Sequence, residues 1–150
     1  MDRRSYVSVY TDGSCNGNPG PGGYAAILKK GRFYKEIAGS VPLASNNRME
    51  LLAVIKGLSE VKPNSNVTVF SDSQYLVSAV NEGRLDIWQS NGWRRIRTLT
   101  PVQNSDLWRG LISIVRERKL EVKFQKLSAH KGHKLNNRAD FLARQAAKAV

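Results

Sequence analysis

Hydrophobic and polar residues follow two different spacings along the 150-residue chain. Short stretches rich in β-branched and aromatic residues, some of them alternating apolar with polar positions, are typical of strands. The Asp12-Gly13 pair is expected to end the first of these, Gly31 separates the next two, and a loop dense in glycine and proline covers residues 14–23. The expected strands are residues 6–11, 24–30, 32–40, 67–71 and 120–127.

Apolar residues at intervals of three and four predict helices between these strands. Ser45 or Asn46 caps the first helix, and Pro63 follows its end. The expected helices run from this cap to about Val61, over about 73–82, over about 105–118 and onward from about Asn136, while residues 83–101 look irregular, basic and aromatic. This order of elements implies an α/β fold with a mixed five-stranded sheet flanked by helices.

Length and composition indicate one globular domain spanning residues 1–150. Hydrophobic residues make up 41% of the chain and charged residues 24%, which excludes a disordered protein. Cys15 is the only cysteine, so we expect no disulfide framework and a reducing compartment. The chain has no secretory signal and no apolar run near the roughly 18 residues that a membrane span needs. We therefore expect a cytoplasmic, free-standing monomer with no membrane partner.

The net charge of the chain and its distribution indicate a polyanionic partner. The formal net charge is +12, and residues 109–150 carry eleven Lys and Arg against three Asp and Glu. A one-sided basic surface is the electrostatic mark of phosphate binding. A basic surface that serves only solubility is the alternative, so charge by itself does not decide the function.

Four acidic residues stand out against this basic background: Asp12 in YTDGSCNG, Glu50 in NNRMELL, Asp72 in VFSDSQY and Asp140 in NNRADFLA. Asp12 follows the first expected strand and Asp72 the fourth, so adjacent parallel strands would bring their carboxylates together. Glu50 and Asp140 lie at the edges of the apolar stripes of their helices. Carboxylates at that depth are costly to keep ionised unless a cation compensates them.

Oxygen ligands without accompanying cysteine favour Mg²⁺ or Mn²⁺ over zinc. Two such ions about 3.5–4 Å apart can activate water and stabilise the leaving oxygen in phosphodiester cleavage. Each acid also has an ordinary structural interpretation, as a turn former, a helix-dipole partner, a cap or a helix-start acid. Four of them together in a basic chain favour the metal site.

Two rival motifs are excluded by their missing residues. A calcium-binding helix-loop-helix loop that begins at Asp12 needs a Glu at its twelfth position, where this chain has Gly23. A Walker phosphate loop needs Gly-Lys-Ser or Gly-Lys-Thr, and neither follows GNPGPGG.

The ordered series TDGSCNGNPGPGGYAAIL, NNRMELLA, SDSQY, NSDLW and NNRADFLAR resembles type 1 ribonuclease H of the bacterial kind, over about residues 6–148. The resemblance implies the ribonuclease H fold and Mg²⁺-dependent hydrolysis of the RNA strand of an RNA–DNA hybrid. The expected products carry 5′-phosphate and 3′-hydroxyl ends.

The resemblance also assigns catalytic residues position by position. It implies that four acids are both catalytic and metal-binding: Asp12, Glu50, Asp72 and Asp140. His130, in the loop SAHKGH, matches a catalytic histidine that assists proton movement or product departure. This chain has Ala129 before that histidine, where the family usually has glycine. His133 is interpreted as structural and not as half of a zinc site.

Substrate contacts follow from the same resemblance. Amide side chains would meet the minor groove of the hybrid, where 2′-hydroxyls distinguish RNA from DNA: Asn18, Asn46, Asn47 and Gln74. Ser45, where the family usually has threonine, would hold a DNA-strand phosphate together with Asn104, and Lys29 would add charge near that site. Each of these residues could instead be only a turn or a cap.

Residues 84–97 match the basic protrusion of the family, which adds phosphate contacts. Its candidate contacts are Arg84, Trp88, Trp93, Arg94, Arg95 and Arg97. We interpret Trp88 and Trp93 as packing at the base of the protrusion more than as stacking on nucleotides.

Three functions are compatible with these observations. The first is an endoribonuclease that acts on RNA–DNA hybrids. The second is a non-catalytic hybrid- or duplex-binding module on the same fold, which is expected to lack one of the metal-binding acids. The third is an integrase or Holliday-junction resolvase on this fold, but those lack the NNRMEL and GNPGPGG blocks at these positions.

Overall fold

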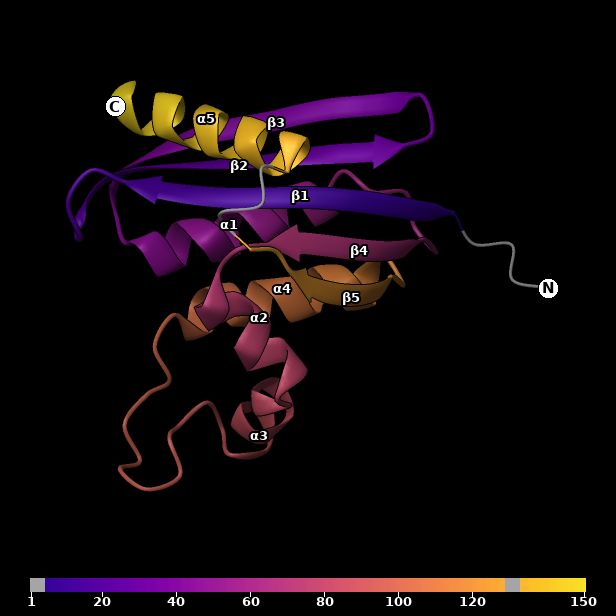
Figure 1. Ribbon diagram of the computed structural model, residues 1–150. Helices are drawn as coiled ribbons and strands as arrows, with labels where there is room; N and C mark the ends of the chain where they lie inside the picture. The colour runs from indigo at the N-terminus through magenta and orange to yellow at the C-terminus, as the bar shows by residue number, and fades with distance from the viewer. Residues whose placement is uncertain (1–4, 129–132) are drawn as a thin grey trace.

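The five strands form one mixed sheet, in the order β3-β2-β1-β4-β5 (Figure 1). The computed structural model describes residues 5–128 and 133–150. β1, β2 and β3 form an antiparallel meander, whereas β4 pairs parallel with β1, and β5 parallel with β4. The sheet confirms the predicted α/β class. Its strands are β1 (Tyr6–Cys15), β2 (Gly20–Lys30), β3 (Phe33–Ala44), β4 (Asn66–Ser71) and β5 (Glu121–Lys126).

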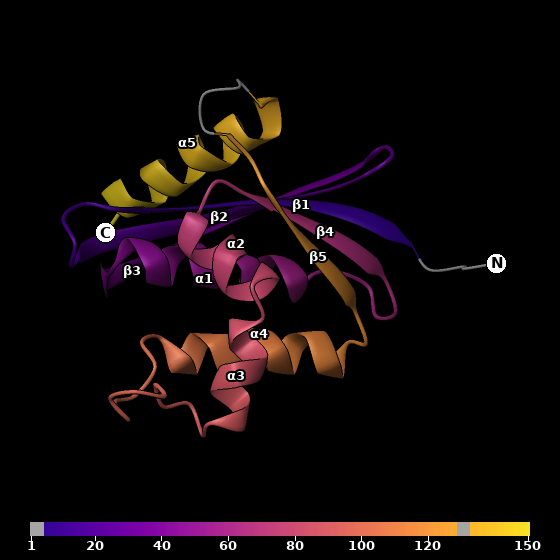
Figure 2. The ribbon, with the colours of Figure 1, turned by 60° about the horizontal axis from the view of Figure 1, so that its bottom comes forward.

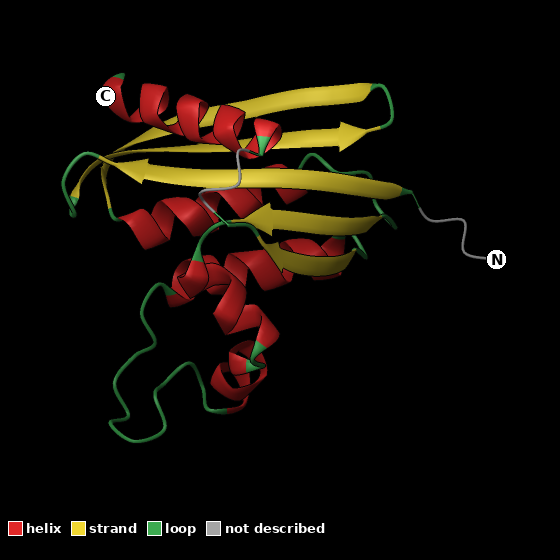
Figure 3. Ribbon diagram, in the orientation of Figure 1, coloured by secondary structure: helices red, strands yellow, loops and turns green. Residues whose placement is uncertain are grey.

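The helices are divided between the two faces of the sheet. α1 and α4 lie on one face and α5 on the other, while α2 and α3 lead away from the sheet toward a protruding loop (Figures 2 and 3). None of the described helices is long and apolar enough to span a membrane. Their bounds are α1 (Asn46–Leu58), α2 (Gln74–Asn81), α3 (Arg84–Ser90), α4 (Ser105–Glu117) and α5 (Lys134–Lys148).

The main core lies between the sheet and the layer of α1 and α4. Apolar side chains of β1 and β4 alternate with polar ones, so that Val9 and Val69 are fully buried on this face. Trp108 of α4 is also fully buried and fills the space beside α1. The members of this core include Leu28, Leu51, Val54, Leu58, Val61, Val67, Leu76 and Leu111.

A second, smaller core holds α5 against the opposite face of the sheet. It consists of Ala25 and Ile27 from β2 with Ala139 and Ala143 from α5, all fully buried. These small side chains allow the helix backbone to approach the strands closely. Gly23 carries this further, because a Cβ there would lie 2.5 Å from the backbone nitrogen of Ala147 and would overlap the carbonyl oxygen of Ala143.

Two segments differ from the sequence-based prediction. Asp12-Gly13 is not a turn, since β1 continues to Cys15, which pairs with Gly22 of β2. Most of the predicted loop over 14–23 is therefore strand, because a neighbouring strand satisfies its backbone groups. The predicted irregular segment over 83–101 begins with the short helix α3. The last helix begins at Lys134, two residues before the expected start.

Candidate metal centre and nucleic-acid interface

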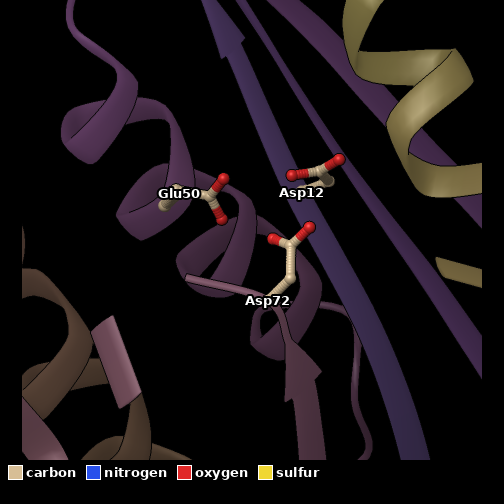
Figure 4. Close-up of side chains that lie close together, drawn as sticks. All are labelled: Asp12, Glu50 and Asp72. Atoms are coloured by element: carbon tan, nitrogen blue, oxygen red, sulfur yellow. The ribbon is translucent and has the colours of Figure 1, made fainter. Parts of the chain in front are cut away.

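Three carboxylates meet at the end of β1 and β4 (Figure 4). Asp12 lies within β1, Asp72 follows β4 directly, and Glu50 projects from α1. The parallel register places Tyr10 beside Phe70, so Asp12 and Asp72 each lie two residues further along neighbouring strands. One oxygen from each of the three carboxylates lies within 4.8 Å of the others. The first and fourth strands are adjacent and parallel, which is the condition under which the sequence placed the two carboxylates together.

Gly13 makes this close approach possible. Its backbone N–H donates to Asp12 Oδ1 at 2.9 Å and to Glu50 Oε1 at 3.1 Å. A Cβ on Gly13 would lie 2.6 Å from the backbone nitrogen of Glu50, so only glycine allows α1 to pack this tightly on β1. This role of Gly13 was not expected from the sequence, where Asp-Gly indicates a turn, because no local signal reports which helix packs on the strand.

Burial raises the proton affinity of two of these acids. Asp12 is 4% exposed and Glu50 is 8% exposed. Burial, with added repulsion from Asp72 and Asp140, raises the pKa of Asp12 to about 7. Burial also raises the pKa of Glu50 well above its ordinary value, and the neighbouring charge of Asp12 adds to this. Ionisation of this group of acids is therefore unfavourable in the protein without a bound cation.

The donor set fits a divalent cation. Glu50 Oε2 is buried and has no hydrogen-bond partner among the described residues, which is costly for a carboxylate oxygen. A cation among the three carboxylates would satisfy this oxygen and offset the repulsion between the acids. All of the ligand atoms are carboxylate oxygens, which hard ions such as Mg²⁺ prefer.

Asp140 lies beside the three acids without belonging to their tight group. Its charge contributes to the raised pKa of Asp12, so the two carboxyls are neighbours. Its side chain is 39% exposed, and Oδ2 lies 3.2 Å from Nε of Arg144, one turn further along α5. Arg144 was not expected from the sequence. His130 lies outside the described residues, and His133 is the N-cap residue of α5 without a side-chain cap bond.

Polar residues at the start of α1 lie at the same end of the sheet. Ser45 is the N-cap, and its hydroxyl accepts a hydrogen bond from the Arg48 N–H at 3.3 Å. Asn18, from the turn between β1 and β2, accepts a hydrogen bond from the Asn46 N–H at 3.1 Å. Asn47 follows in the first turn of α1 and is half-buried. Ser45 and Asn18 thus have structural partners here, and Asn46 is exposed.

Arg48 joins this helix start to α4. Its guanidinium donates to both carboxylate oxygens of Asp106, at 2.9 and 2.7 Å, and to Asn104 Oδ1 at 3.3 Å. Asn104 Nδ2 and Trp108 Nε1 both donate to the hydroxyl of Tyr75, at 3.1 and 3.0 Å. Arg48 therefore contacts Ser45 through its backbone N–H and Asn104 through its guanidinium. Arg48 was missed because nothing in the sequence pairs it with Asp106.

Two further predicted contacts lie on separate elements. Gln74 is the exposed first residue of α2, and its amide hydrogen-bonds to Ser78. The structure contradicts the predicted place of Lys29 near the Ser45 site. Lys29 pairs with Tyr34, whereas Ala44, next to Ser45, pairs with Gly20 at the opposite end of the β2–β3 hairpin. Nine residues of β2 separate the two positions, about 30 Å of extended strand.

The protrusion consists of α3 and the segment that follows it. Trp88 and Trp93 are half-buried and pack against the main core, with their ring centroids 6.5 Å apart. The ring of Trp88 also lies 5.8 Å from that of Trp108, and both Trp88 and Trp93 pack at the base of the protrusion. Arg94 and Arg95 are exposed, and Arg94 donates to the Leu99 carbonyl at 3.0 Å. The exposed positive charge of the protrusion therefore comes from Arg94 and Arg95, while Trp88 and Trp93 pack the protrusion against the core.

Comparison with known proteins agrees with this geometry. The RNase H family profile matches residues 4–148. A ribonuclease H of Chlorobium chlorochromatii is 46% identical over 145 residues, which is 97% of each chain. The structure resembles LC9-RNase H1, a type 1 RNase H with the type 2 active-site motif, with a TM-score of 0.82 and 28% identity over 97% of this chain and 74% of that one.

A second solved structure shares the fold. LC11-RNase H1, in complex with an RNA/DNA hybrid, has a TM-score of 0.72 and 21% identity, over 95% of this chain and 97% of that chain. The family match and the 46% identity together cover nearly the whole length of the chain. The chain therefore belongs to the ribonuclease H family, and its likeness to LC9-RNase H1 fits the type 1 branch.

Proposed function

We propose that this protein is a metal-dependent endoribonuclease that hydrolyses the RNA strand of RNA–DNA hybrids and leaves 5′-phosphate and 3′-hydroxyl ends. The observation that carries the proposal is the group of three carboxylates within 4.8 Å of one another on a chain of net charge +12. Crowded anions on a polycation suit a cation that binds together with a phosphate backbone. The hybrid in complex with LC11-RNase H1 supports the choice of substrate.

Asp12, Glu50 and Asp72 are the proposed ligands of Mg²⁺, with Mn²⁺ as a substitute, and Asp140 completes the set from α5. Two bound divalent cations would supply an activated water and stabilise the leaving oxygen of the RNA phosphodiester. Burial and mutual repulsion raise the pKa values of Asp12 and Glu50 in the metal-free protein, so a cation bound among these carboxylates would favour their deprotonated form. Gly13 helps, because its N–H orients Asp12 Oδ1 and Glu50 Oε1 toward the same point.

The proposed role of His130 is to carry a proton or to help the product leave, and it rests on the family resemblance. A histidine suits this role because its ordinary pKa lies near neutrality. A His130→Ala variant is expected to retain metal binding and to lose turnover. Equal turnover by the variant and the wild type in a steady-state cleavage assay would remove His130 from the mechanism.

Recognition of the hybrid is assigned to residues at two sides of the acids. The amides of Asn18, Asn46, Asn47 and Gln74 are suited to 2′-hydroxyls and base edges in the minor groove. Ser45 and Asn104 are the proposed holders of one DNA-strand phosphate, and Arg48 contacts both, Ser45 through its backbone N–H and Asn104 through its guanidinium. The exposed Arg94 and Arg95 add phosphate contacts from the protrusion.

Three labelled duplexes of one sequence test the proposal: an RNA–DNA hybrid, a double-stranded DNA and a double-stranded RNA. In Mg²⁺ we expect cleavage of the RNA strand of the hybrid, with products that a 5′-phosphate-dependent exonuclease degrades. Preference for either of the other duplexes would refute the proposed substrate. Binding of the hybrid without turnover in either Mg²⁺ or Mn²⁺ would favour the non-catalytic module.

We also infer that the chain acts as a single catalytic domain in the cytoplasm. The family profile covers residues 4–148, and the only cysteine, Cys15, donates hydrogen bonds to the carbonyls of Gly20 and Ala44. Limited proteolysis should leave one core fragment of nearly full length. Fractionation of cells should recover the hybrid-cleaving activity with cytoplasmic markers.

A further inference from the structure

A basic hollow lies on the α5 face of the sheet, and none of the roles described so far uses it. Side chains of β2, β3 and the first two turns of α5 line it, and three of these side chains are cationic. The lining residues are Lys29, Tyr34, Lys134, Leu135, Asn137 and Arg138. Lys134 and Arg138 lie one turn apart on α5, and the fold brings Lys29 of β2, which is distant in the sequence, to the same hollow.

One of the three cations is already neutralised. Arg138 donates to both carboxylate oxygens of Glu36, at 2.7 and 3.1 Å, and Tyr34 donates to the same carboxylate at 2.5 Å. The Arg138 hydrogen bonds, followed by that of Tyr34, lower the pKa of Glu36 to about 2, so this pair is ionised at any ordinary pH. Arg138 and Glu36 therefore form a fixed wall of the hollow and carry little net charge.

The two lysines are left with uncompensated charge. Lys29 is half-buried and Lys134 is exposed, and neither forms an ion pair with any residue in 5–128 or 133–150. Two ammonium groups beside a neutralised wall repel each other, which slightly destabilises the protein alone. An anion between them would reverse this effect. The hollow is therefore suited to a ligand with negative charge and several acceptor oxygens.

The hollow lies on the same face of the sheet as Ala25, the β2 partner of Asp12. Asp12 pairs with Ala25, and Ala25 and Lys29 point to the same face because they are an even number of residues apart. Four residues of strand correspond to about 13 Å. Along α5, Lys134 precedes Asp140 by six residues, or about 9 Å of helix. Each strand of a nucleic acid rises about 3.4 Å per nucleotide along the duplex axis, so the hollow lies a few nucleotides from the metal centre.

We propose that Lys29 and Lys134 form a phosphate subsite, which holds a backbone phosphate of the hybrid a few nucleotides from the cleaved bond. This inference rests on the proposed function and adds a contact on the α5 side, opposite the side of α1 and the protrusion. The Arg138–Glu36 pair keeps the wall of the subsite in place. The subsite holds the hybrid in register and takes no part in bond cleavage.

The double variant Lys29→Ala/Lys134→Ala tests the subsite, and Lys56→Ala/Lys62→Ala is the matched control. The control removes the same charge from exposed positions on α1 and just after it, beyond the other face of the sheet. Hybrid affinity is measured over a range of salt concentrations in an Asp12→Asn background, which prevents cleavage. Loss of one phosphate contact should lower the slope of log affinity against log salt by about 0.9. The control should leave the slope unchanged, and equal slopes for the two double variants would overturn the proposal.

Hybrids shortened stepwise from each end separate a defined subsite from general attraction. The affinity deficit of Lys29→Ala/Lys134→Ala should vanish when the hybrid is shortened on one side only. A deficit that persists at every length on both sides would overturn the subsite. Lys29→Arg/Lys134→Arg should keep the wild-type affinity, which controls for misfolding.

The proposed function and the subsite fail in different ways. With Asp12 intact, Lys29→Ala/Lys134→Ala should raise KM for a long hybrid about threefold to tenfold and leave kcat unchanged. Wild-type protein that cuts no hybrid would refute the proposed function whatever the salt slopes are. Normal wild-type cleavage with identical KM values for the double variant and its control would refute only the subsite.

Discussion

Asp12→Asn should stabilise the metal-free protein at alkaline pH, although it removes a residue of the proposed active site. Asparagine has the shape of aspartate and keeps the Oδ1 acceptor for the Gly13 N–H, which lies 2.9 Å away. What it removes is a buried negative charge that lies near Glu50, Asp72 and Asp140. In the metal-free protein, this charge lowers the free energy of unfolding.

The magnitude follows from the pKa of Asp12, which burial raises from 3.8 to about 7. Each unit corresponds to about 1.4 kcal/mol, so the fully ionised carboxylate destabilises the metal-free fold by roughly 4 kcal/mol. A buried amide retains part of this cost, because it too is removed from water. We therefore expect Asp12→Asn to increase the free energy of unfolding by about 1–3 kcal/mol, or roughly 3–10 °C in Tm for a chain of this size.

The pH dependence gives the sign of the effect. An acid whose pKa is raised by folding carries no penalty below its unfolded pKa, near 4, and the full penalty above its folded pKa, near 7. The stabilisation by Asp12→Asn should therefore be full at pH 8 and nearly absent at pH 4. Urea denaturation in EDTA at these two pH values measures it.

Asp106→Asn is a control with the opposite sign. In the wild type, the hydrogen bonds from Arg48 lower the pKa of Asp106. The Asp106–Arg48 pair therefore stabilises the protein above the unfolded pKa of Asp106, and this stabilisation is lost as the pH falls through the folded pKa. This variant should lose stability at pH 8 and show a smaller loss in acid. A loss of stability for Asp12→Asn at pH 8, or an equal gain at both pH values, would refute the reasoning from buried, mutually repelling acids.

Three further outcomes follow from the same structure. Millimolar Mg²⁺ or Mn²⁺ should raise the wild-type Tm in a thermal melt, because each tenfold excess of metal over Kd adds about 1.4 kcal/mol to the free energy of unfolding. Asp12→Asn should lose most of this rise in Tm. Gly23→Ala should cost about 1–3 kcal/mol in denaturant unfolding and reduce hybrid cleavage by about 10²-fold, since the added methyl group overlaps the α5 backbone and moves Asp140. Tyr75→Phe should cost about 1–3 kcal/mol in the same unfolding assay, because Asn104 and the buried Trp108 lose their acceptor.

The acids could be predicted from the sequence because the strands that carry two of them were recognisable by themselves. The apolar runs before Asp12 and Asp72 indicate strands, and their parallel pairing then brings the two carboxylates together. The depth of Glu50 in its helix was likewise readable from the apolar stripe on either side of it. These features depend on local pattern and on one rule of sheet topology.

Other features depend on tertiary contacts that local pattern does not report. Asp12-Gly13 favours a turn by itself, but pairing with β2 extends the strand through Cys15. The length of β2 then carries Lys29 about 30 Å from the site to which the family resemblance assigned it. Arg144, which pairs with Asp140, and the double hydrogen bond of the Gly13 N–H could only be seen once the helices were placed on the sheet.

Cleavage of a hybrid with a labelled RNA strand, by the wild-type protein and by Asp12→Asn under single-turnover conditions in Mg²⁺, tests the central claim most directly. The account predicts rapid cleavage of the RNA strand by the wild type and a rate at least about 100-fold lower for Asp12→Asn, which has lost a charged ligand at the point where the three acids meet. Equal rates for the two proteins, in samples shown to be folded by their thermal melts, would contradict the assignment of these carboxylates as the catalytic metal centre.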